Sequence, residues 1–308
     1  MIKGYQGLLL LVSLAGLLLG LHLSTDYAGT NRQSAARPAT RTSFQATAPL
    51  ESFTDADFTR HVEQLKKKLP SNEFSIVIQP PFVVIGDQAA TVVKAHSEST
   101  VKWAVDKLKQ DFFAKDPKEI LDIWLFKDSV SYEKNALALF GEKPTTPYGY
   151  YSSTDNALVM NIGPGAGTLS HELVHPYIEA NFPDAPSWFN EGLASLYEQP
   201  REREGHMWGT TNWRLPGLTS MIRKKDIPTL RTLLTTTNDE FYNAEFDAYA
   251  YARFLCQYLQ DHGKLRDFYK DFVASKDHTG VTSLEKAVGK SLEEFQPEFN
   301  KWALSLRR

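Results

Sequence analysis

Hydrophobic residues in this chain first form one continuous block and later recur in strand-like and helix-like periods. The block spans residues 7–23 and is interrupted only by Ser13, His22 and three glycines. Lys3 precedes it, and no small-residue cleavage site follows it, so we expect residues 1–23 to be a signal peptide or a membrane anchor, with the anchor favoured. Seventeen helical residues span about 25 Å, the short limit for crossing a bilayer.

The segment that follows the block has no hydrophobic period. Residues 24–50 are rich in Ser, Thr, Ala and Arg, which is typical of a flexible linker. Folded sequence is expected from residue 51 onward. We predict a single domain at 51–308, with an α/β half at 51–165 and a helical half at 166–308. If the block anchors or exports the chain, this domain is expected outside the cytoplasm, either membrane-anchored or secreted.

Strand-like and helix-like segments alternate in the first half of the domain. Beta-branched or apolar runs predict strands, and a 3.6-residue apolar period predicts helices. The expected strands cover residues 74–78, 82–85, 120–126, 148–151 and 157–162. The expected helices cover residues 100–113 and 129–140, the second closed by Gly141. These segments predict a small mixed sheet with helices on one side.

The second half reads as mostly helical, so the predicted fold class is α+β. Thr168 is the expected N-cap of a helix that Pro176 should kink or end. A second helix should begin near Ser187. A long aromatic helix is expected at residues 241–260, ending near Gly263. A final helix starts with a capping box formed by Ser291 and Glu294 and should bury apolar residues, namely Phe295, Phe299, Trp302 and Leu306.

Composition narrows the classes of protein. The net charge is −3, and no run of Lys and Arg dominates any predicted face, so no nucleic-acid partner is expected. Cys256 is the single cysteine, which excludes an intrachain disulfide and a cysteine-based zinc site. Its apolar surroundings predict a buried side chain. Residues 201–209 are charged and loop-like, and His206 within them is expected at the surface or as a substrate contact.

Three residues at helical spacing carry the candidate chemistry. His171 and His175 are four positions apart, so on a helix both imidazoles can reach one ion. Glu172 follows the first histidine, and its carboxylate would be free to handle a water beside that ion. The alternative is a pair of helix-surface histidines with an ordinary acidic neighbour.

A catalytic zinc needs a third protein ligand. Glu191 is the candidate, because it follows His175 by sixteen residues, enough for one helix to end and another to return beside it. Gly192 and Ala194 would permit close approach of the two helices. The competing interpretation of Glu191 is an acidic residue favoured by the helix macrodipole.

The two motifs, His171-Glu172-x-x-His175 and Trp188-x-x-Glu191-Gly192-x-Ala194, together resemble the gluzincin branch of zinc metallopeptidases. That branch contains the thermolysin-like and peptidase-MA-like enzymes, and the resemblance covers roughly residues 150–260. It implies a zincin-like fold and one Zn²⁺ held by two histidines and a glutamate, His171, His175 and Glu191.

The same resemblance implies roles for further residues. Glu172 would be the general base, and a tyrosine on a later helix would stabilise the oxyanion. Tyr249 matches that position better, and Tyr251 is the alternative; either could instead be a core aromatic. The strand at residues 157–162 resembles the edge strand that holds an extended peptide.

The leading functional hypothesis is therefore a zinc metallopeptidase that acts on a peptide or protein substrate and is linked to the membrane by its N-terminal segment. Two alternatives stay open at this point. One is a zinc amidohydrolase with a non-protein substrate. The other is a non-catalytic binding or scaffold protein on the same fold.

Overall fold

The computed structural model describes residues 53–307. The predicted signal or anchor at residues 1–23 and the predicted linker at 24–50 lie outside these described residues. Within the described range, no helix combines the length and the apolar character needed to cross a bilayer.

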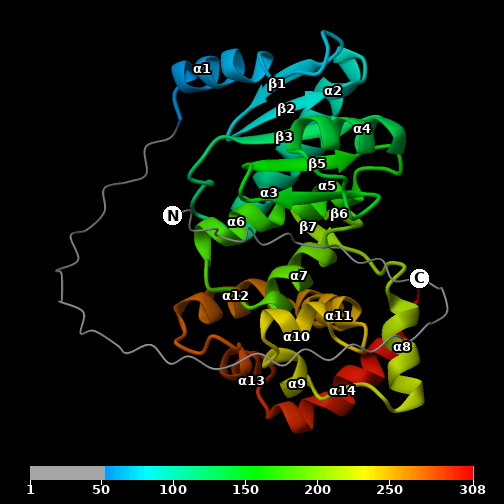
Figure 1. The fold of residues 1–308 in the computed structure, drawn as a ribbon. Helices are drawn as coiled ribbons and strands as arrows, with labels where there is room; N and C mark the ends of the chain where they lie inside the picture. Colours follow the sequence, from blue (N-terminus) through cyan, green and yellow to red (C-terminus); the bar gives the residue numbers. More distant parts are fainter. Residues whose placement is uncertain (1–52, 308) are drawn as a thin grey trace, which may run out of the picture. The chain divides into compact units, whose positions relative to one another are not determined.

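A five-stranded mixed sheet organises the first half of the domain, as expected (Figure 1). The strand order is β1-β2-β3-β5-β4, with β2, β3 and β5 parallel and the two outer pairs antiparallel. Pro80 and Pro81 make the turn between β1 and β2. The strands are β1 Ser75–Gln79, β2 Phe82–Gly86, β3 Leu121–Phe126, β4 Gly149–Ser152 and β5 Ala157–Asn161.

The strand order corrects one expectation about the sheet edge. The strand predicted at residues 157–162 is β5, and it lies between β3 and β4 rather than at the edge. The turn that follows β4 returns the chain so that β4 covers the outer side of β5. Among the described residues, β4 is therefore the outer strand on this side of the sheet.

Helices cover both faces of the sheet, so the prediction of helices on one side was wrong. Alternate residues of a strand face opposite sides. Val83 and Ile85 of β2 pack with α1 (Asp55–Lys66) and α4 (Ser129–Phe140). Phe82 and Val84 pack with a second set of helices on the opposite face, α2 (Ala90–His96), α3 (Trp103–Asp111), α5 (Gly167–Glu172) and α6 (Val174–Asn181).

The helix expected at residues 100–113 begins earlier than its apolar period suggests. It starts at Ala90 with α2, passes through a π-helical turn at Ser97–Lys102 and continues as α3. Residues 90–100 supply only one fully buried apolar side chain, Val93, so the hydrophobic pattern alone placed the start too late. By contrast, α4 has the predicted bounds and ends at Gly141, which adopts a positive φ of 81°.

Helices make up most of the second half, and Figure 1 shows α5–α7 between the sheet and the remaining helices. A two-stranded hairpin, β6 (Pro200–Arg203) and β7 (His206–Gly209), follows α7. The later helices are α7 Ser187–Leu196, α8 Leu215–Lys224, α9 Leu230–Leu234, α10 Asn238–Tyr242, α11 Ala248–Asp261, α12 Leu265–Ala274, α13 Val281–Val288 and α14 Leu292–Ser305.

One expectation about the first histidine helix was wrong, and the interruption expected from Pro176 is present three residues before that proline. Ala166, not Thr168, precedes α5, and no side chain caps it. Pro176 does not end the helix, because it is the third residue of α6, which continues to Asn181. The first turn of a helix has no intrahelical acceptor for its N–H groups, so a proline is tolerated there. The helical path is instead divided at Leu173, between α5 and α6.

The long helix expected at residues 241–260 is two helices. Thr237 and Glu240 form a capping box that starts α10, and Asp247 caps α11 by accepting a hydrogen bond from the Ala250 amide. The predicted capping box of Ser291 and Glu294 at α14 is present. That helix buries Phe295 and Phe299 fully, whereas Trp302 and Leu306 stay half-buried at its outer side.

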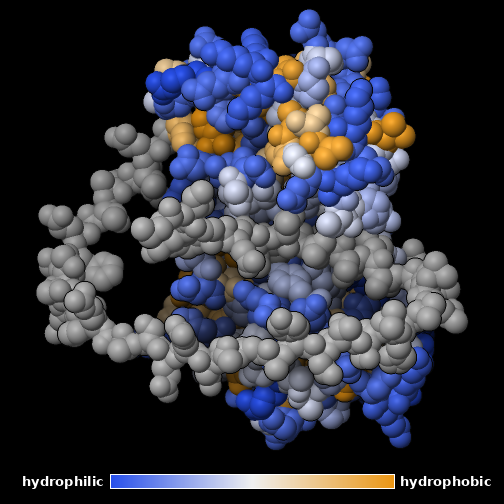
Figure 2. All heavy atoms as spheres, in the orientation of Figure 1, coloured by the Kyte–Doolittle hydropathy of each residue, from blue (hydrophilic) through white to orange (hydrophobic). Residues whose placement is uncertain are grey.

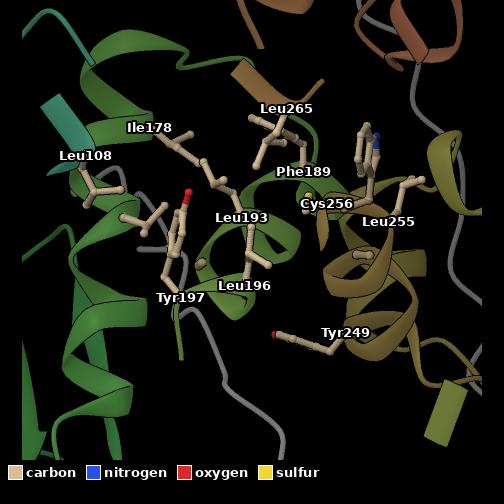
Figure 3. Close-up of a cluster of buried hydrophobic side chains, with 14 of the residues drawn as sticks. Leu108, Ile178, Phe189, Leu193, Leu196, Tyr197, Tyr249, Leu255, Cys256 and Leu265 are labelled. Atoms are coloured by element: carbon tan, nitrogen blue, oxygen red, sulfur yellow. The ribbon is translucent and has the colours of Figure 1, made fainter. Parts of the chain in front are cut away.

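Helices α7 and α11 pack closely at Gly192. A Cβ atom at this position would lie 2.9 Å from the Ala252 carbonyl oxygen and 3.1 Å from the Cys256 Sγ. Figure 3 shows side chains of both helices joining one buried cluster around Cys256. Cys256 is buried as predicted, and burial raises the pKa of its thiol.

We expect Gly192→Val to lower the free energy of unfolding by about 1–3 kcal/mol, because the added side chain meets backbone that must shift. Denaturant unfolding of wild type and variant measures the change. Lys301→Val is the matched control, since Lys301 is on the exposed side of α14. Equal unfolding midpoints for Gly192→Val and wild type would contradict the close packing.

On the face shown in Figure 2, the described residues of the sheet half have only small hydrophobic patches. Val130 and Leu137 of α4 are exposed, but Figure 2 shows the hydrophobic patches of this side as small and separated by hydrophilic residues. Patches of this kind are ordinary on soluble domains.

Candidate metal centre

Three consecutive helices bring the predicted site residues together. The short helix α5 ends with His171 and Glu172, α6 begins with His175 at its second position, and α7 carries Glu191. The ring centroids of the two histidines are 5.0 Å apart. All four side chains are buried.

The two histidines and Glu191 converge on one point. One ligand atom from each lies within 4.8 Å of the others. The Nε2 atom of His171 is 3.4 Å from the Oε2 atom of Glu191. Nitrogen and oxygen ligands at about 2.0–2.1 Å from a tetrahedral zinc are about 3.3–3.4 Å apart. The separation of these two atoms therefore suits a shared zinc ion.

Buried polar atoms without partners also indicate a cation. The Nε2 atoms of both histidines, Oε2 of Glu191 and both carboxylate oxygens of Glu172 are buried and make no hydrogen bond. Each such atom costs about 1–3 kcal/mol if it stays unsatisfied. Unpaired nitrogen and oxygen atoms gathered at one point are the partners that a metal ion and an adjacent water would have. The residues present therefore fit a zinc ion.

The charges around the site favour a positive group at its centre. Burial acts to lower the pKa of His171, but the carboxylates of Glu191 and Glu198 raise it to about 10. Burial lowers the pKa of His175 to about 4, which keeps that imidazole neutral. Burial acts to raise the pKa of Glu191, but the two histidines and a tyrosine hydroxyl hold it below its usual value.

Glu172 differs from Glu191 in its electrostatic environment. Burial raises the pKa of Glu172 to about 8, partly offset by the charge of His171. A carboxylate with a pKa near neutrality can both take and return a proton. Its Oε2 atom is 3.7 Å from Nε2 of His175, beside the ligand set.

Two polar residues orient the ligands, and the sequence-based prediction missed both. The Oδ1 atom of Asn190 lies 2.9 Å from Nδ1 of His175. An amide oxygen only accepts, so Nδ1 carries the proton and Nε2 keeps its lone pair for the site. Tyr242 donates a hydrogen bond of 3.0 Å to Oε1 of Glu191. The position of Asn190 directly before Glu191 was the available signal.

A third group, behind His171, was also missed. The Oε1 atom of Glu198 lies 3.5 Å from Nδ1 of His171. Glu198 accepts hydrogen bonds from two further buried residues, Arg214 and Asn212. Burial acts to raise the pKa of Glu198, but the Arg214 guanidinium and His171 lower it to about 2. Glu198 follows Glu191 by seven residues and lies just beyond the end of α7, and that spacing was the only sequence signal.

The two candidate tyrosines of α11 have different surroundings. The Tyr251 hydroxyl donates to the Pro228 carbonyl, at 3.1 Å, and contacts Gln296, away from the ligand set. Tyr249 packs beside Tyr242, and Figure 3 shows its hydroxyl directed away from α11. Burial, followed by the charge of Glu191, raises the pKa of Tyr249, so its hydroxyl stays protonated.

His206 lies in the hairpin rather than in a loop, which corrects the expectation for residues 201–209. Glu204 and Gly205 both have positive φ, as a tight hairpin turn requires. His206 is half-buried, with Nδ1 2.6 Å from Oδ1 of Asp111. Lys107 of α3 donates to the Gly205 carbonyl. These contacts attach the hairpin to α3 and give His206 a structural partner.

Comparison of the chain with protein-family models finds no match, and comparison with curated proteins also finds none. The mixed α+β fold is observed, and the zincin-like class stays a prediction based on the two motifs and the positions of His171, His175 and Glu191.

Proposed function

We propose that this chain is a zinc-dependent metallohydrolase of the zincin-like class that cleaves peptide bonds. The convergence of His171, His175 and Glu191, with unpaired buried atoms facing one another, is the observation that carries the proposal. Among the described residues three ligand groups converge, one fewer than a structural zinc takes, which leaves a position open for a water beside Glu172 and supports catalysis.

A zinc ion held by these three side chains would supply Lewis-acid chemistry, polarising the substrate carbonyl and making a water acidic near neutral pH. Glu172 accepts the proton of that water as the water attacks the carbonyl carbon. The same carboxyl group then returns the proton to the leaving nitrogen. Burial raises the pKa of Glu172 in the metal-free site, and the charge of a bound zinc ion would lower it, which favours the ionised form that accepts the proton.

The outer strand β4 is the proposed support for the substrate. This strand contacts α5, the helix that carries Glu172, so it runs beside the proposed general base. An extended peptide paired with the outer side of β4 would form main-chain hydrogen bonds. We therefore propose the peptide role for Gly149–Ser152 instead of the strand first expected, because β4 is the outer strand among the described residues.

Tyr249 is the proposed donor to the oxyanion. We expect Tyr249→Phe to lower kcat by about 10²–10³-fold, the usual effect of losing one such donor, with zinc affinity unchanged. Tyr251→Phe should leave kcat within a few-fold, because the Tyr251 hydroxyl points to Pro228 and Gln296. Steady-state kinetics on one peptide substrate compares the pair. A larger loss in the Tyr251 variant would reverse the assignment.

The first test combines zinc content with hydrolysis by the full chain. About one zinc per chain, together with cleavage of unstructured peptides that a chelator abolishes and added zinc restores, would support the proposal. A chain that takes up no zinc after reloading would refute it. Stoichiometric zinc without any peptide cleavage, but with hydrolysis of a non-peptide amide, would favour the amidohydrolase alternative.

A further inference from the structure

The two nitrogens of His171 face opposite groups. Nε2 lies 3.4 Å from Glu191, on the side of the proposed zinc, and Nδ1 lies 3.5 Å from Glu198, on the other side. Nδ1 makes no hydrogen bond, so this contact is electrostatic, and a carboxylate at that distance favours the tautomer in which Nδ1 carries the proton. The position of Glu198 therefore decides how His171 presents Nε2 to the site.

Glu198 in turn depends on Arg214. The Arg214 Nε donates to Oε2 of Glu198 at 2.9 Å, and Nη2 donates to Oε1 at 2.6 Å, a two-pronged pair that is almost fully buried. Asn212 adds a hydrogen bond of 2.9 Å to Oε2. The planar guanidinium matches both carboxylate oxygens at once, which a lysine could not do.

Arg214 also contacts the other side of the proposed site. Its Cζ atom lies 5.2 Å from the ring centroid of Tyr249, within the range of a cation–π contact. Asp247, the N-cap of α11, adds to the charges that raise the pKa of Arg214. One guanidinium thus contacts both the carboxylate behind His171 and the ring of Tyr249.

We propose that Arg214 is a positioning residue for the hydrolytic site, fixing His171 through Glu198 and holding the ring of Tyr249 at the same time. This inference rests on the proposed zinc hydrolase function. Arg214 touches neither the ligand atoms nor the reacting water. It sets the geometry of one metal ligand and of one oxyanion donor, and so couples residues from α5 and α11.

A second buried arginine provides a matched control. Arg253 of α11 is fully buried and donates to the carbonyl oxygens of Ser195 and Thr210 and to Gln257. Loss of Arg253 should destabilise the fold much as loss of Arg214 does. None of these hydrogen bonds goes to His171, Glu198 or Tyr249, and only the charge of Arg253 acts on Glu198, so its loss should affect zinc binding much less than loss of Arg214.

The experiment measures zinc affinity by chelator competition, kcat on a peptide, and thermal unfolding of the metal-free full chain. Glu198→Gln and Arg214→Met should each weaken zinc affinity about 10–100-fold, the range for partners of ligand histidines. The double variant should be no weaker than Arg214→Met alone, because both changes act through the same histidine. Arg253→Met should keep zinc affinity within about twofold despite a comparable drop in unfolding temperature.

Kinetics separates the second role of Arg214. At saturating zinc, Arg214→Met should lower kcat more than Glu198→Gln does. When both variants also carry Tyr249→Phe, their kcat values should be equal. Low concentrations of guanidinium ion should restore part of the lost zinc affinity in Arg214→Ala, which an effect on folding alone would not allow. If Arg214→Met does not fold, Arg214→Lys is measured in the same way. Lysine keeps the positive charge but cannot bond both carboxylate oxygens of Glu198 at once.

The possible failures are distinguishable. A wild type without zinc overturns both the hydrolase proposal and this inference. A wild type that binds zinc, with Glu198→Gln and Arg214→Lys binding it as tightly, overturns the positioning role and leaves the hydrolase proposal standing. Equal weakening in the Arg253 and Arg214 variants would also overturn it, because the effect would then be a general loss of stability.

Discussion

Replacing Glu172 with Gln should reduce kcat by about 10²–10⁴-fold while zinc stays bound, the range expected when a general base is lost. The amide has the shape of the carboxylate but cannot take a proton from the attacking water. Glu172 is not one of the three converging ligands, so the metal should be retained. Steady-state kinetics and zinc content measured on the same preparation give the two readouts.

Glu179→Gln is the matched control for Glu172→Gln. Glu179 lies on α6, accepts a hydrogen bond from the Tyr151 hydroxyl and has no contact with the ligands. The control should keep kcat within a few-fold of wild type. Unchanged hydrolysis in Glu172→Gln would remove this residue from the mechanism and return the assignment of the base to another group.

Replacing Glu191 with Ala should weaken zinc binding by more than 100-fold, beyond the usual effect of losing an outer partner of a ligand. The change removes one of three ligands and the group that neutralises much of the charge of the ion. Elemental analysis after dialysis should give about one zinc per wild-type chain and almost none for the variant. Hydrolysis should fall in proportion to the zinc that is lost.

Tyr242→Phe distinguishes loss of the ligand from loss of its support. This variant keeps the Glu191 carboxylate and removes only the 3.0 Å hydrogen bond to its Oε1 atom. Zinc affinity should fall by about 10-fold, at the lower end for such partners. A Glu191→Ala protein that holds zinc as tightly as wild type would mean that the three-ligand site is wrong.

The residues of the candidate site were more predictable than the residues that support them. The spacing of His171 and His175 follows from helical geometry, and the return of Glu191 follows from a short connection between two helices. Glu198 and Arg214 are separated by the β6–β7 hairpin, and no local pattern reveals that the chain returns to pair them. Long-range pairing of this kind depends on tertiary packing.

The fold was predictable where local signals were strong. Gly141 and the Ser291–Glu294 capping box fixed helix boundaries that the structure shares. Sheet order was not predictable in the same way, because β4 and β5 have similar apolar patterns and only their pairing shows which is outermost. Helix α1 was missed although its signal is local: Phe58, Val62 and Leu65 recur at helical spacing after a capping box of Thr54 and Asp57.

The close contact of α7 with α11 at Gly192 has a consequence for the entropy of metal capture. Glu191 adjoins that glycine, so its backbone is already immobilised by the core when the chain is free of metal. The Glu191 backbone then loses little conformational entropy when an ion binds. The affinity for the ion should be higher than if this backbone were mobile beforehand. We therefore expect the amides of this segment to exchange with solvent mainly when the whole domain opens.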